Sequence, residues 1–166
     1  MLHGVRRAPV PVYLLETSHP VRGGRGRELR PGRLESAVDD LYRELILDAY
    51  KNPRNRGRLE EPDASYEDEN PLCGDVIRMD LEIRNGVIEA AKFSGHGCAI
   101  SQASADLILE RVKGQPVEVV LSLSREDVFE ELGVESLTVS RVKCAMLPLK
   151  VLKAAAYGMQ PSLKPG

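Results

Sequence analysis

One segment near the middle of the chain alternates between apolar and charged residues, and this alternation constrains the fold more than any other feature. The alternating residues are Ile77, Arg78, Met79, Asp80, Leu81, Glu82, Ile83 and Arg84. Successive side chains of a β-strand point to opposite faces, so the pattern predicts a strand over 76–84 with one buried and one wet face. Asn85-Gly86 follows, which is the strongest two-residue hairpin signal, so residues 87–93 are expected to return antiparallel.

Many of the remaining apolar residues follow a helical period, which predicts helices elsewhere in the chain. The predicted helices begin near Ser36 and at residues 98, 116, 125 and 144, and residues 94–97 are predicted to form a turn before the second of them. In the last helix, Pro148 is expected in the first turn, where proline is tolerated. A short strand is predicted around residues 65–66. The domain therefore combines an antiparallel hairpin with several helices.

The first part of the chain differs in charge from the rest. Residues 1–33 contain seven Arg, no Lys and two Glu, a net charge of +5 within a chain of net charge −2. Glycines and prolines interrupt this segment, so we expect residues 1–35 to be a basic, disordered extension. The folded domain is then 36–158, and residues 159–166 form a C-terminal tail. An Arg-rich, acid-poor start also resembles a mitochondrial presequence, which makes the mitochondrial matrix the alternative to a cytoplasmic location.

Composition narrows the range of partners. No apolar run approaches the roughly 20 residues that cross a bilayer, so no membrane partner is expected. A basic tail can touch nucleic acid, but a disordered extension is the simpler interpretation, and no nucleic-acid partner is expected. Three cysteines cannot all pair within one chain, and the N-terminus lacks the continuous apolar stretch of a secretory signal. A reducing compartment is therefore expected, where thiols usually serve metal or sulfur chemistry.

The three cysteines lie at predicted element boundaries. Cys73 falls in a turn before the alternating strand, and Asp75, two positions on, points the same way, so both side chains can reach one point. Cys98 and Cys144 are each predicted to open a helix, where the helix N-terminus lowers a thiol pKa and favours the thiolate that binds metal and attacks sulfur. A lone cysteine is often only a small buried hydrophobe, but three at such positions favour a metal or sulfur site.

Three segments carry a resemblance to a known family. They are Asn-Pro-Leu-Cys-Gly-Asp at 70–75, Gly-His-Gly-Cys-Ala-Ile-Ser at 95–101 and Arg-Val-Lys-Cys-Ala-Met-Leu at 141–147. These segments resemble the three cysteine motifs of the IscU/SufU/NifU N-terminal family, and the similarity extends over about 36–158. The resemblance implies an α/β fold of the α+β type, with a small antiparallel three-stranded sheet packed by several helices. It also implies that Cys73, Asp75, Cys98 and Cys144 are the ligands of a metal ion or cluster.

The function implied by this resemblance is that of an iron–sulfur cluster assembly scaffold. Such a protein accepts sulfur from a pyridoxal-phosphate-dependent cysteine desulfurase, binds iron, builds a [2Fe–2S] cluster and transfers it to apo iron–sulfur acceptor proteins. Cys144 or Cys98 is the candidate persulfide acceptor. Three thiolates and one carboxylate suit such a cluster and also tetrahedral Zn²⁺. Because the oxygen ligand is harder than thiolate, Asp75 is expected to keep the site labile.

Two departures from the family pattern leave an alternative open. Lys143 stands where IscU-type members have a His before the third Cys, which resembles the SufU branch and indicates a zinc-dependent sulfurtransferase, an enzyme rather than a scaffold. SufU-type members also carry an insertion between the second and third cysteines, for which the step from Cys98 to Cys144 is too short. The chaperone-recruiting Leu-Pro-Pro-Val-Lys segment of IscU-type members is replaced by 137–141. A third interpretation is a structural zinc-binding domain.

Several nearby residues are auxiliary candidates. His96 is either an alternative ligand or a solvated turn residue. Lys143 is either a partner of Asp75 or of a thiolate, or a solvated lysine. Arg141 belongs to the same motif and is also auxiliary. The basic residues Arg54, Arg56 and Arg58 are interpreted as a solvated surface, with an acidic partner as the alternative.

Overall fold

The structure is a computed structural model that describes residues 32–158, with side chains from Asp39 onward. Its elements are α1 (Gly32–Lys51), β1 (Ala64–Asn70), β2 (Asp75–Arg84), β3 (Val87–His96), α2 (Ala99–Val112), α3 (Val117–Ser122), α4 (Arg125–Leu132) and α5 (Val139–Tyr157). The predictions for residues 1–31 and 159–166 lie outside the described residues. Among residues 32–158, no helix combines the length and the apolar character that crossing a bilayer requires.

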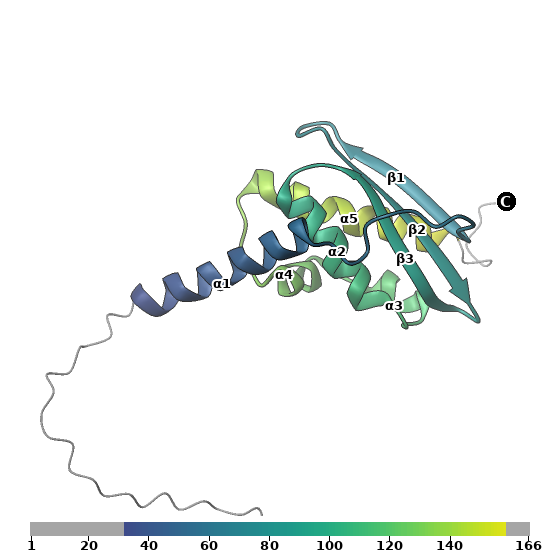
Figure 1. Cartoon of the computed structure of the whole chain (residues 1–166), viewed down its shortest axis with the longest axis horizontal. Coiled ribbons are helices and arrows are strands. Elements are labelled where there is room, and N and C mark those ends of the chain that lie inside the picture. Colours follow the sequence, from purple (N-terminus) through teal and green to yellow (C-terminus); the bar gives the residue numbers. More distant parts are fainter. Residues whose placement is uncertain (1–31, 159–166) are drawn as a thin grey trace, which may run out of the picture. The chain divides into compact units, whose positions relative to one another are not determined.

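The sheet has three antiparallel strands in the order β1-β2-β3, so the alternating segment is the central strand. Helix α5 packs against β1 and β2, and α2 packs against β3 and α5 (Figure 1). The core lies between the sheet and these helices; its largest fully buried side chains include Phe93, Ile77, Met79, Leu81, Ile88, Ile108, Leu109, Leu132 and Leu152. The predicted α+β class, with a three-stranded antiparallel sheet packed by helices, is confirmed.

The β2–β3 hairpin follows the sequence pattern closely. Asn85 and Gly86 both have positive φ, 51° and 76°, as the tight hairpin turn requires. The apolar face of β2 is buried as predicted. The opposite face is less wet than predicted, because Asp80 is only 2% exposed. Its carboxylate accepts hydrogen bonds from the Ser65 hydroxyl at 2.5 Å and from the Leu59 backbone N–H at 3.3 Å.

The prediction of a turn at 94–97 is wrong for its first three residues, because β3 continues to His96. Gly95 pairs with Ile77, and His96 pairs with Val76. Gly95 has φ +128°, and a Cβ on it would collide with the carbonyl oxygen of Val76. Only glycine therefore lets the strand run this close to β2, and the three added residues bring the following helix to the start of β2.

Two helices also begin earlier than predicted. Helix α1 begins at Gly32 rather than near Ser36, and α5 begins at Val139 rather than at Cys144. Pro148 is therefore inside α5 instead of in its first turn. A proline inside a helix cannot donate the bond that the carbonyl four residues earlier would accept, and here that carbonyl belongs to Cys144. The helix hydrogen bond that α5 lacks would therefore have ended on the carbonyl of Cys144, a residue of the candidate site.

We expect Gly95→Ala to lower the free energy of unfolding by about 2–4 kcal/mol, since the added Cβ combines an unfavourable φ with a backbone collision. Gly86→Ala is the matched control. Its φ is also positive but nothing lies within 4 Å of the added Cβ, so it should cost about 1 kcal/mol. Urea unfolding of both variants measures the difference. Equal losses in the two variants would contradict the close approach of β3 to β2.

Candidate metal centre

Four elements supply the predicted site residues. Cys73 lies in the loop between β1 and β2, Asp75 is the first residue of β2, Cys98 precedes α2, and Cys144 lies in α5. One potential ligand atom from each of Cys73, Asp75 and Cys144 lies within 4.8 Å of the others. The sulfur atoms of Cys73 and Cys144 are 3.7 Å apart. Three of the four predicted ligands therefore meet at one point, and Cys98 does not belong to this group.

The backbone around Asn70 fixes the position of Cys73. Asn70 pairs with Asp75 across the β1–β2 hairpin, so the connecting loop holds only four residues. The Asn70 carbonyl accepts the N–H of Cys73 at 3.2 Å and that of Gly74 at 2.8 Å. The Asn70 side chain accepts the Leu72 N–H at 3.1 Å. This tight loop holds the exposed thiol of Cys73 at the tip of a hairpin, next to α5.

Asp75 is a buried carboxylate with one free oxygen. The residue is 3% exposed, and its Oδ1 accepts the backbone N–H of Cys98 at 3.2 Å. Its Oδ2 is buried and has no hydrogen-bond partner among the described residues. Burial acts to raise the pKa of Asp75, but the nearby Cys73, Ser101 and Cys98 lower it below its ordinary value overall. An ionised oxygen without a partner is a costly arrangement that a bound cation would satisfy.

Cys98 occupies the N-cap of α2, which confirms that it opens this helix. Its sulfur accepts the backbone N–H of Ser101 at 3.5 Å and lies 3.7 Å from the Ser101 hydroxyl. Because this sulfur serves as the cap, it is directed at the first turn of its own helix. Its backbone N–H binds Asp75, and its thiol is close enough to lower the pKa of Asp75 and to raise that of Cys144.

The prediction that Cys144 is a helix-start thiolate is wrong. Helix α5 begins five residues earlier, at Val139, and Cys144 is only 5% exposed. Burial raises the pKa of the Cys144 thiol, and the neighbouring thiols of Cys73 and Cys98 raise it further. Its S–H donates to the carbonyl of Ser140 at 3.5 Å or to the sulfur of Cys73. Negative charge at Cys144 therefore needs a cation beside it.

A polar chain that the sequence did not reveal supports the turn between β3 and α2. The Gln102 side chain donates to the carbonyl of Gly97 at 2.8 Å. Arg56 in turn donates to Gln102 and to the carbonyl of Gly95. Arg56 was interpreted as part of a solvated basic surface, and this interpretation is incomplete, because its guanidinium holds the backbone on both sides of the site's turn. No local sequence signal connects residues so far apart.

The auxiliary candidates lie around the edge of the site. His96 is exposed at the end of β3, and Lys143 and Arg141 are exposed on α5. The group of three ligand atoms includes no histidine, and in the described part of the chain Asp75 has no hydrogen bond or ion pair with Lys143. Their contributions to the site stay predictions.

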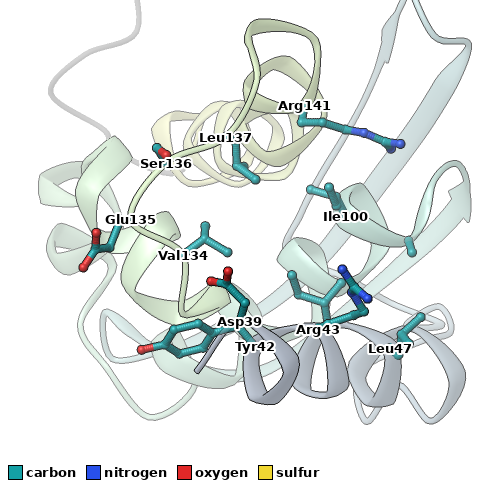
Figure 2. A pocket seen from close by; sticks show the side chains of 12 residues that line it. Asp39, Tyr42, Arg43, Leu47, Ile100, Val134, Glu135, Ser136, Leu137 and Arg141 are labelled. Carbon is teal, nitrogen blue, oxygen red and sulfur yellow. The ribbon is translucent and has the colours of Figure 1, made fainter. Parts of the chain in front are cut away.

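A groove of about 1060 Å³ adjoins Cys98 on the side of α1. It is lined by Asp39, Tyr42, Arg43, Ile46, Leu47, Ala99, Ile100, Val134, Glu135, Ser136, Leu137 and Arg141. Figure 2 shows Ile100, Val134 and Leu137 pointing into it from three sides, with Arg43 and Arg141 near one end. Ala99 and Ile100 follow Cys98 directly, so the groove leads to the cysteine turn.

The donor set fits a thiophilic metal. Two sulfurs and a carboxylate oxygen lie close together, with a third thiol in the adjoining turn. Zn²⁺ is bound by Cys and Asp in tetrahedral sites, and iron–sulfur clusters are held by Cys thiolates. The Oδ2 of Asp75, which is buried and has no hydrogen-bond partner in the described part of the chain, is the observation that most directly indicates where a cation would bind.

Comparisons with known proteins found a matching family and similar sequences. The sequence model of the family described as NifU-like N-terminal domain matches residues 41–162. Zinc-dependent sulfurtransferase SufU of Bacillus subtilis is 37% identical over 132 residues, covering 70% of this chain and 89% of that protein. Iron–sulfur cluster assembly scaffold protein IscU of Thermotoga maritima is 40% identical over 130 residues, covering 69% of this chain and 92% of that protein.

One solved structure has a similar fold. A protein of Fervidobacterium islandicum, proposed as the iron–sulfur cluster assembly scaffold of the SUF system, superimposes with a TM-score of 0.59 at 30% identity. The match covers 68% of this chain and 94% of that one. The similar fold thus extends over most of the described residues.

We expect Gly97→Ala to weaken Zn²⁺ binding roughly tenfold, as changes around metal ligands commonly do. A Cβ at this position would lie 2.6 Å from the Ser101 hydroxyl oxygen and 2.8 Å from Cγ of Asp75, so it must displace the carboxylate. Competition with a chromophoric chelator measures the affinity, and Gly86→Ala is the control that leaves the site untouched. Unchanged affinity in Gly97→Ala would show that Asp75 does not contribute to metal binding.

Proposed function

The chain belongs to the NifU-like N-terminal domain family, and from this premise we propose that it is an iron–sulfur cluster assembly scaffold. Its substrates are then sulfur from a cysteine desulfurase and iron, and its cargo is a [2Fe–2S] cluster passed to apo-proteins. The observation that carries the proposal is the meeting of Cys73, Asp75 and Cys144, with one buried carboxylate oxygen left without a partner. Relatives named as scaffolds support the choice.

Each ligand has a distinct role in this proposal. Cys144 is the buried anchor on α5, and Cys73 is the exposed ligand on the hairpin loop, where cargo enters and leaves. Asp75 is the harder ligand that lets the cargo exchange. We assign Cys98 as the fourth ligand, since its backbone N–H already holds the Asp75 carboxylate. Cys98 and Cys144 remain the candidates for accepting persulfide.

A zinc-dependent sulfurtransferase is the second candidate function. Lys143 before the third cysteine and the 37% identity to a protein of that name favour it. Resident Zn²⁺ would hold the thiols as thiolates until one is released to accept sulfur. Cys73, Asp75 and Cys144 are as suitable for that ion as for a cluster, so an experiment must separate the two functions.

We expect Asp75→Ala to retain a reconstituted cluster and to transfer it roughly tenfold more slowly to an apo-ferredoxin. Three thiols remain to hold iron, while the exchangeable oxygen ligand is lost. Transfer is followed by the visible absorption and circular dichroism of the acceptor. Glu67→Ala, an exposed acid on the edge strand, is the matched control. If Asp75→Ala transfers its cluster as fast as the parent, Asp75 does not set the rate of release.

Zinc separates the two functions. In a scaffold, Zn²⁺ competes for the thiols, so it should slow persulfide uptake from the desulfurase and prevent cluster formation from ferrous iron and sulfide. The measurements are desulfurase turnover and visible absorption under anaerobic conditions, with and without Zn²⁺. Stimulation of the desulfurase that requires Zn²⁺, together with no stable chromophore from iron, would reject the scaffold and support the sulfurtransferase.

A further inference from the structure

Two of the three thiols are already positioned for reaction with each other. The sulfurs of Cys73 and Cys144 are 3.7 Å apart although 71 positions separate them in the sequence. A disulfide requires about 2.05 Å, so an approach of about 1.7 Å would join them. An ion pair of 2.5 Å between Lys150 of α5 and Asp68 of β1 fixes the two supporting elements against each other. Cys73 lies on an exposed loop, and Gly74 beside it has open space around it.

We infer that Cys73 and Cys144 form a sulfide-releasing dithiol pair. When Cys144 carries a persulfide and no metal occupies the site, the exposed Cys73 attacks the inner sulfur of that persulfide. The product is a Cys73–Cys144 disulfide and free sulfide. The inference rests on the proposed function in one respect, because that function supplies the persulfide.

The step is balanced without an external reductant. A new S–S bond forms between the two cysteine sulfurs, and the bond between the inner and outer persulfide sulfurs breaks. With the outer persulfide sulfur counted as S⁰, each of the two cysteine sulfurs gives up one electron, and the outer sulfur takes both and leaves as HS⁻. The proton of the attacking thiol passes to the departing sulfide or to water. This is thiol–disulfide exchange with sulfide as the leaving group.

Cys98 neighbours Cys144 but lies outside the close group that contains the pair. Its sulfur caps α2 by accepting the Ser101 N–H and does not belong to the close group of Cys73, Asp75 and Cys144. A persulfide on Cys98 is therefore expected to persist longer than one on Cys144, which Cys73 resolves. Bound iron or zinc suppresses the reaction, because a ligated thiolate is a poor nucleophile. Metal-free protein thus loses its sulfur as sulfide, and the disulfide that remains removes two of the predicted ligands.

The experiment uses metal-free, fully reduced chain under anaerobic conditions. One arm mixes it with desulfurase preloaded with persulfide and freed of cysteine; the other uses glutathione persulfide as a small donor. Sulfide is quantified by methylene blue, and alkylation with peptide mapping locates persulfides and disulfides. We expect about one sulfide per persulfide placed on the pair, with a matching amount of Cys73–Cys144 disulfide. Cys73→Ser and Cys144→Ser should each lower sulfide release at least tenfold, by roughly the advantage of an intramolecular thiol.

Glu67→Ala, an exposed acid on β1, is the matched control, and it should release sulfide like the parent in the glutathione persulfide arm. Circular dichroism of Cys73→Ser and Cys144→Ser confirms that each is folded, and Cys73 is exposed, so its substitution tests the chemistry without disturbing the core. Undiminished sulfide release from Cys73→Ser, or stable persulfide in the parent with both thiols of the pair free, would overturn the inference. Sulfide and disulfide with glutathione persulfide but not with desulfurase would support the pair and contradict the proposed sulfur donor.

Discussion

The carboxylate of Asp75 connects the parts of the molecule that make up the site. Asp75 is the first residue of the central strand, and its Oδ1 accepts a hydrogen bond from the backbone N–H of Cys98 at the start of α2. Its other oxygen has no partner among the described residues, although a buried polar atom without one costs free energy. A folded domain tolerates such an atom where a bound ligand supplies the interaction that the atom lacks. The hairpin loop, the helix start and α5 are therefore arranged around an oxygen to which residues 32–158 donate no hydrogen bond.

The close contact between Asp75 and Cys98 depends on glycine. Gly95 allows β3 to run three residues further along β2 than its sequence suggests, and Gly97 leaves room for the Asp75 side chain. A side chain at either position would push the turn away from the start of β2. The polar chain from Arg56 through Gln102 then holds the turn's carbonyls from the other side. Backbone geometry and long-range hydrogen bonds thus position a site whose ligands are carried on short, irregular segments.

Local sequence patterns predicted most of the helices and strands. Features that depend on contacts between distant residues were not predicted from these patterns. Alternation and Asn85-Gly86 were sufficient for the central hairpin because strand period and turn chemistry are local properties. The early start of α5 was missed because Pro148 argues locally against a helix, whereas burial of α5 against the sheet outweighs that preference. The motif resemblance named Cys73, Asp75 and Cys144 as ligands, and the structure places these three residues close together. It could not show that Cys98 would direct its sulfur at Ser101, which depends on the capping geometry of one turn.

The Asp75 carboxylate and the buried Cys144 thiol differ in charge when no metal is bound. Asp75 has a lowered pKa and is ionised, whereas burial and neighbouring thiols raise the pKa of Cys144 and favour its protonated form. A metal ion that binds both must displace the Cys144 proton, so loading is coupled to proton release. Cation binding and ionisation of Cys144 therefore favour each other, and a site with that property can both bind its cargo firmly and return to a metal-free state.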